Sequence, residues 1–170
     1  MRIIQMLSTI AYGDAVSNDT IAMEKVIKSM GYSTRIYAES IVAPLDKRTA
    51  LHVDELKEVS PEDIIIFHMS TGSKLNFEVA KYKCRKIVVY HNITPPEYFE
   101  KNDYRFKQIC EYGLEGAKYL ADKVDYCLAV SEFNKQDLIR MGYKCKIDVL
   151  PIIIPMSDYD KKPDKGVIKE

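Results

Sequence analysis

The sequence lacks tryptophan, has only three histidines among its 170 residues, and contains no apolar run of membrane-spanning length. Its 25 basic and 25 acidic side chains cancel, so no overall charge draws the chain to nucleic acid or to an anionic membrane. The apolar start at residues 3–7 is too short for a signal-peptide core. We therefore expect a cytoplasmic protein without a nucleic-acid partner. The basic segment 101–107 is either a contact for an anionic acceptor or the periphery of a membrane, or a solvated helix start.

Motifs that would identify a cofactor or a reaction are also absent. The four cysteines form no CxxC pair and the histidines are not spaced to complete a zinc site, so we expect reduced thiols and no metal. Gly13 stands alone in the first loop, and without GxGxxG a dinucleotide cofactor is disfavoured. Neither a GxxxxGK[ST] phosphate loop nor a supported Ser-His-Asp order occurs. No cofactor is expected.

A regular alternation of strand and helix patterns is present. Strands are predicted at residues 2–7, 33–38, 63–68, 87–90, 126–130 and 147–153, and helices at 18–30, 51–59, 75–83, 103–123 and 135–141. This order predicts an α/β fold with a Rossmann-like, doubly wound, mostly parallel sheet and helices on both faces. Residues 1–156 are predicted to form this one domain. Residues 157–170, rich in Asp, Lys and Pro, are predicted to be a linker or tail.

The clearest candidate for a ligand site is the end of the apolar stretch 87–90, which runs straight into His91 and Asn92 and is stopped by Pro95 and Pro96. Such a stretch is typical of a strand buried on both faces, and ligands bind at the carboxyl edge of open α/β sheets. His68 and Ser131 end similar stretches, which would bring three polar groups to one rim. A histidine at a strand end is more often structural than catalytic.

The loop through Gly13 is a second candidate. It leads into a helix whose free amides and dipole can bind a phosphate, although an ordinary strand-to-helix turn explains the same pattern.

Four segments carry a family resemblance. They are the first strand with its loop through Gly13; Val88-Val89-Tyr90-His91-Asn92; Ala129-Val130-Ser131-Glu132-Phe133-Asn134 with Asp137-Leu138 and Gly142; and Val149-Leu150-Pro151-Ile152-Ile153-Ile154-Pro155. Together they resemble the N-terminal domain of retaining glycosyltransferases of the GT-B fold, family 4. In the last segment isoleucines replace the Asn-Gly that is usual in that family. The likeness extends over nearly the whole chain.

The resemblance implies transfer of a sugar from a nucleotide-sugar donor to a sugar, lipid or saccharide acceptor, without a metal. By position, Gly13 would place backbone amides near the donor's diphosphate, and His91 would face the reacting sugar as charge develops on it. Asp14, Asn92 and Ser131 would belong to the same rim. In this family a C-terminal domain with paired glutamates holds most of the donor. The chain would then be an acceptor-side half that folds alone but turns over no sugar without that partner domain.

Two other classes of function stay open from the residues alone. The chain could be a stand-alone binding module that takes a small phosphorylated ligand at the same rim. It could also be another α/β enzyme, such as a hydrolase, in which His91 works with a nearby serine or cysteine. Tyr98, Phe99 and Tyr104 follow His91 and either stack on a sugar or pack against the two prolines.

Overall fold

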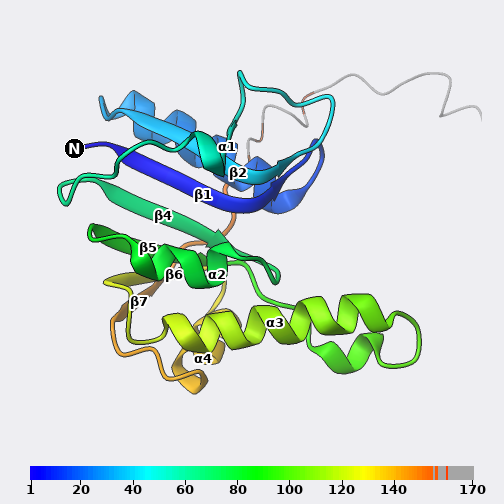
Figure 1. Cartoon of the computed structure of the whole chain (residues 1–170). Helices are drawn as coiled ribbons and strands as arrows, with labels where there is room; N and C mark the ends of the chain where they lie inside the picture. Colours follow the sequence, from blue (N-terminus) through cyan, green and yellow to red (C-terminus); the bar gives the residue numbers. More distant parts are fainter. Residues whose placement is uncertain (155, 157–159, 161–170) are drawn as a thin grey trace, which may run out of the picture.

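The computed structural model describes residues 1–154, 156 and 160, and it contains one seven-stranded parallel sheet in the order β3-β2-β1-β4-β5-β6-β7 (Figure 1). The strands are β1 (Ile3–Ile10), β2 (Thr34–Ile41), β3 (Leu51–His52), β4 (Ile64–Met69), β5 (Arg85–Tyr90), β6 (Tyr126–Ala129) and β7 (Lys146–Val149). The helices are α1 (Ala15–Ser29), α2 (Leu75–Glu78), α3 (Tyr104–Leu120) and α4 (Glu132–Arg140), with short 3-10 helices η1 (Val53–Glu55), η2 (Val79–Lys81) and η3 (Pro96–Phe99). The predicted Rossmann-like, doubly wound fold is confirmed.

The predicted linker at 157–170 lies, except for Asp160, outside the described residues. Among the residues that are described, no helix combines the length and the apolar character needed to cross a bilayer.

Several predicted elements differ from the structure. The helix predicted at 75–83 is α2 followed by η2, and the helix predicted at 135–141 begins earlier, at Glu132. Three further differences have clear causes or consequences. The helix predicted at 51–59 is wrong: Leu51 and His52 pair with β2 as the short edge strand β3, and η1 follows. The first helix begins at Ala15 because the Asp14 side chain accepts a hydrogen bond from the Ser17 amide at 2.8 Å, which makes Asp14 its N-cap. The strand predicted at 147–153 is shorter in the structure, where β7 extends only from Lys146 to Val149.

Alternation along the strands gives the sheet two different faces. On one face, apolar side chains of β4, β5 and β6 such as Phe67, Val88 and Ala129 pack with α2, α3 and α4 in the main core. On the other face, Ile66 and Val89 pack with Met23 and other residues of α1. Helices therefore cover both faces, as Figure 1 shows, and each face has its own core.

The chain that leaves β7 runs back toward α1 (Figure 1) and joins the second core. Ile153 packs with this core, and its backbone amide donates to Asp19 Oδ1 of α1 at 2.7 Å. This hydrogen bond links the segment after β7 to α1, between residues that are 134 positions apart in the sequence.

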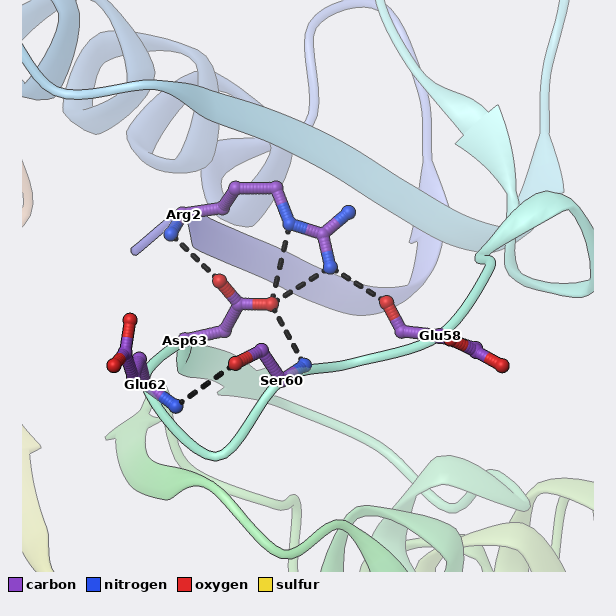
Figure 2. A network of polar contacts seen from close by, with 5 residues as sticks. All are labelled: Arg2, Glu58, Ser60, Glu62 and Asp63. Carbon is purple, nitrogen blue, oxygen red and sulfur yellow. Dashed lines mark hydrogen bonds and ion pairs between the residues drawn. The ribbon is translucent and has the colours of Figure 1, made fainter.

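The amino edge of the sheet is held by one ion-pair network, shown in Figure 2. Asp63, just before β4, accepts from the backbone amide of Arg2 at 2.7 Å, from its guanidinium at 2.7 Å and from the Ser60 amide at 3.0 Å. The hydrogen-bonded Arg2 guanidinium is the main reason why the pKa of Asp63 falls to about 2, despite burial that leaves its side chain only 2% exposed. The network lies at the edge opposite the candidate site, so its role is structural.

Candidate functional site

The carboxyl ends of β1, β4, β5 and β6 meet at one edge of the sheet because all four strands are parallel. The Gly13 loop follows β1, His91 comes directly after β5, and Ser131 lies two positions after the end of β6. His68 lies within β4, where it pairs with Val89 of β5. The sequence prediction that these groups share a rim is therefore confirmed.

The imidazole of His91 lies directly against that of His68. His68 Nδ1 is 3.1 Å from His91 Nε2, and the two ring centroids are 5.4 Å apart. On its other side, His68 Nε2 lies 3.0 Å from Oε1 of Gln5 in β1. Because an amide oxygen only accepts, His68 Nε2 donates this hydrogen bond. Three side chains thus form one polar chain across β1, β4 and β5.

Asp19 of α1 completes this buried group from above the sheet. Its Oδ2 lies 3.7 Å from His91 Nε2, and the side chains of Asp19 and His91 are only 3% and 1% exposed. Its other oxygen, Oδ1, accepts the hydrogen bond from the Ile153 amide. The group therefore connects three strands, α1 and the segment that returns from β7.

Burial keeps both histidines neutral near pH 7. It lowers the pKa of His91 from its ordinary value to about 4, while the Asp14 carboxylate acts weakly in the opposite direction. It also lowers the pKa of His68 well below the ordinary value, and the neighbouring His91 adds to this effect. Burial raises the pKa of Asp19, whereas the hydrogen bond from Ile153 opposes that rise. A neutral imidazole can accept and donate one hydrogen bond, so His91 is suited to orient a polar ligand.

The loop through Gly13 and Asp14 lies close enough to His91 for the Asp14 carboxylate to influence the His91 pKa. Gly13 has φ +77°, a conformation that L side chains rarely adopt. Asp14 Oδ2 accepts from both the amide and the hydroxyl of Ser17, at 2.8 and 2.7 Å. Asp14 is therefore committed to capping α1, which orders the loop.

The two remaining predicted residues have different surroundings. Ser131 is the N-cap of α4, since its hydroxyl accepts from the Asn134 amide at 3.2 Å and donates to Asn134 Oδ1 at 2.5 Å. Asn92 has φ +77° and is one of the residues that line a cleft of about 620 Å³ beside the end of β5. The structure thus places His91 and the Gly13 loop at the same edge of the sheet, while Ser131 caps α4 and Asn92 lines a neighbouring cleft.

That cleft lies on the α3 and α4 side of the same edge. It is lined by Tyr90, Asn92, Ile93, Thr94, Pro95, Pro96, Glu97, Tyr98, Leu114, Lys118, Phe133, Asp137, Arg140 and Met141. A second cleft, of about 660 Å³, opens between β2, the loop after β4 and α3, with Glu39, Ser73 and Tyr112 among its lining residues. Neither of these two clefts has His91 or Gly13 in its lining.

The side chains of His68, His91 and Asp19 are also the group that could hold a metal ion. One donor atom from each lies within 4.8 Å of the others. Two imidazoles and a carboxylate are ligands that suit zinc or iron. The sequence prediction of no metal site relied on the spacing of the histidines along the chain, and the parallel strands bring together what that spacing separates.

Gln5 and Asp19 were missed by the sequence analysis. Gln5 interrupts the apolar stretch of β1 on the face where Ile3 and Leu7 point, and a polar residue there is a signal for a buried hydrogen bond. Asp19 has a weaker signal, because a carboxylate in the second turn of a helix is ordinarily exposed. Only the fold shows that its side of α1 faces the sheet.

Comparison with protein-family models and with curated protein sequences gives no match for this chain.

Proposed function

We propose that the chain is the acceptor-side domain of a glycosyltransferase that moves a sugar from a nucleotide-sugar donor to an acceptor. One observation carries the proposal: a buried His91 after the end of β5 shares the carboxyl edge of the parallel sheet with the Gly13–Asp14 loop that opens α1. This pairing fits the two roles that the sequence resemblance assigns, a loop for the diphosphate and a histidine for the sugar.

The proposal requires this chain to bind a diphosphate and to hydrogen-bond a sugar hydroxyl, and its groups suit both tasks. Free backbone amides at the start of α1, together with the helix dipole, favour an anionic diphosphate. The neutral imidazole of His91 can hydrogen-bond a hydroxyl of the donor sugar without adding a charge beside the anomeric carbon. Positioning and preorganised polar groups of this kind are the usual source of large rate effects.

The cleft of about 620 Å³ is proposed to take the acceptor. It opens at the same edge, and Asn92 connects its lining to His91 along the chain. Tyr98 and Phe133 present exposed rings there, and aromatic faces suit the apolar faces of sugars. The rings of Phe99 and Phe106 instead stack on each other, with their centroids 5.6 Å apart, so they support the segment after His91.

The remaining parts of the proposal come from the resemblance alone. A second lobe of the same protein would hold most of the nucleotide and close over the edge that carries His91. The protein would work in the cytoplasm or at the periphery of a membrane, with a saccharide or lipid acceptor and no resident metal. A hydrolase is disfavoured, because the described side-chain partners of His91 are His68 and Asp19, with no serine or cysteine between them.

The test is an assay of the natural gene product that contains this chain, with a panel of nucleoside diphosphate sugars and with saccharide and lipid acceptors. Product is followed by mass spectrometry and by release of the nucleoside diphosphate. His91→Ala should lower kcat by about 100-fold or more, the effect of removing a group that acts on the reacting centre. Lys57→Ala, at an exposed position next to the amino edge, should leave the rate unchanged.

Two results would contradict the proposal. One is full activity of His91→Ala in an enzyme that transfers sugar. The other is the absence of transfer with every donor, together with binding of a simple phosphorylated ligand at the same edge, which would identify a binding module. Turnover by the 170-residue chain alone would contradict the part of the proposal that needs a second lobe.

A further inference from the structure

The imidazole of His91 has one nitrogen with a partner and one without. Nε2 faces His68 Nδ1 at 3.1 Å, whereas His91 Nδ1 is buried and meets no hydrogen-bond partner among the described residues. A buried polar atom left unpaired lowers stability by about 1 to 3 kcal/mol, so native proteins rarely keep one without a reason. Nδ1 is therefore a candidate for contact with a ligand, which would have to displace neighbouring side chains to reach it, because the His91 side chain is only 1% exposed.

The chain of hydrogen bonds decides whether that nitrogen donates or accepts. Gln5 Oε1 accepts, so the proton of neutral His68 lies on its Nε2, 3.0 Å away. His68 Nδ1 then carries a lone pair and accepts from His91 Nε2. Neutral His91 has only one ring proton, and it is used in this bond. Its Nδ1 is left as an acceptor.

Asp19 favours the same arrangement by a separate route. Its Oδ2 lies 3.7 Å from His91 Nε2, where a negative oxygen attracts an N–H and repels a lone pair. Burial raises the pKa of Asp19, and the amide of Ile153, which donates to Oδ1 at 2.7 Å, opposes that rise. Two independent contacts, one from the sheet and one from α1, thus place the proton of His91 on Nε2.

We propose that Gln5, His68 and Asp19 are positioning residues that hold His91 in the Nε2–H tautomer, so that its Nδ1 accepts a hydrogen bond from a ligand hydroxyl. That the hydroxyl belongs to a sugar rests on the proposed function; the tautomer does not. In this arrangement Gln5 Oε1 faces His68 Nε2 at 3.0 Å, while Gln5 Nε2 is buried and has no hydrogen-bond partner among the described residues. The arrangement selects for neutral O–H donors over anionic groups, because a lone pair repels an anion.

The tautomer is measured directly by nuclear magnetic resonance of the 170-residue chain with nitrogen-15 in its histidine rings, without any ligand. At pH 7 the spectrum should show both His68 and His91 protonated on Nε2 alone. A His91 ring protonated on Nδ1 would overturn the proposal. Addition of Zn²⁺ should leave the spectrum unchanged. A switch of His91 to the Nδ1–H form with Zn²⁺, reversed by a chelator, would also overturn it, because metal ligation at Nε2 displaces the proton.

Variants separate a positioning role from a structural one. His68→Leu removes the acceptor for His91 Nε2, whereas His68→Asn, of similar size, keeps an amide oxygen at that place. His91 should become a mixture of tautomers in the leucine variant and return to the Nε2–H form in the asparagine variant. Gln5→Met leaves both rings in place and should mix the tautomers of both, which gives a second test should His68→Leu fail to fold.

The same variants give an activity readout in the natural gene product. We expect His68→Leu to lower kcat about tenfold, as the loss of one oriented hydrogen bond does, with His68→Asn restoring most of it. A His91 tautomer that stays wholly Nε2–H in both His68→Leu and Gln5→Met would show that these residues do not position it. Failure of the sugar-transfer assay would leave the ring spectrum intact, so the two proposals fail separately.

Discussion

His68 and His91 are 23 positions apart in the sequence, yet Nδ1 of the first lies 3.1 Å from Nε2 of the second. The contact follows from the register of the sheet: His68 pairs with Val89, so the residue two places beyond Val89 on the same face is the diagonal neighbour of His68. Gln5 reaches His68 by the same diagonal relation from β1, since His68 pairs with Leu7. The polar chain is a direct product of three parallel strands in register.

The buried histidines predict a loss of stability in mild acid. The pKa of His91 is lowered to about 4, so the unfolded chain binds a proton there between pH 6.5 and 4 that the folded chain refuses. The contribution is therefore present above pH 6.5 and lost as the pH falls toward 4, by about 3 kcal/mol for this one group. Urea unfolding followed by circular dichroism at several pH values measures it.

Two histidine variants, at His91 and at His52, are compared with the natural sequence to test this prediction. His91→Gln should reduce the dependence of the unfolding free energy on pH over this range, and the part that comes from buried His68 should remain. His52→Gln, which removes a histidine in the edge strand β3 outside the buried group, is the matched comparison. Equal slopes in all three proteins would contradict the burial of a neutral His91.

The Asp63 network predicts a second loss at lower pH. The pKa of Asp63 is depressed to about 2 by the hydrogen-bonded Arg2 guanidinium, so its contribution is present above pH 4 and disappears as the pH falls toward 2. Asp63→Asn should lower the unfolding free energy by about 1 to 2 kcal/mol at pH 7, a range discounted because Arg2 is 42% exposed. It should also reduce the dependence of the unfolding free energy on pH between 4 and 2, by the part that comes from Asp63.

Asp46 provides a matched control, since it pairs with Arg48 at 2.8 Å in an exposed loop. Asp46→Asn should leave the unfolding free energy unchanged within error, because exposed ion pairs contribute little. An equal loss in both variants would mean that the network at the amino edge has no special role.

Close contact between α3 and the loop after β4 predicts a strong effect at Gly72. A methyl group added there would overlap the carbonyl oxygen of Ile109 and lie 2.9 Å from the backbone nitrogen of Gly113. Gly72→Ala should destabilise the fold by about 3 kcal/mol, because backbone must move to relieve the overlap. Gly31→Ala, with φ +85° and open space, should cost only about 1 kcal/mol. Thermal unfolding of the two variants decides this, and similar losses would contradict the close packing.

The N-cap of α1 predicts that substitutions at two polar residues near the start of this helix have different effects on stability. Asp14→Ala should lower the unfolding free energy by about 1 kcal/mol, since it removes the side chain that caps the Ser17 amide. Asn18→Ala should have little effect, because Asn18 is an exposed residue inside α1. The reverse order would place the cap at Asn18, the residue at which the sequence pattern predicts the helix to begin.

Much of the fold is predictable because local signals agree with the global arrangement. Apolar stretches such as 64–67 and 87–90 identify buried strands, and Gly31 and Gly142 end α1 and α4 with positive φ. The short strand β3 is not predictable, because two residues are too few to show the alternation of side chains that identifies a strand. Its pairing depends on β2 being in place, which is a tertiary effect.

The candidate site was predictable only in its location. Parallel strands guarantee that groups such as His91 and the Gly13 loop meet at one edge, and this needs no knowledge of side-chain packing. The cap roles of Asp14 and Ser131 resemble ligand roles in sequence, since both uses favour a short polar residue before a helix. The contact between Asp19 and His91 depends on how α1 rotates over the sheet, which the sequence pattern does not specify.

The most direct measurement of the central claim is a titration of the natural gene product, labelled in its histidine rings and glycine amides, with UDP-glucose and GDP-mannose as first probes of the donor panel. Resonances of His91 and of the Gly13 amide should shift together at the same ligand concentration, while Gly31, at the far end of α1, stays unchanged. Binding that leaves both His91 and Gly13 unmoved, across every donor of the panel, would contradict the account.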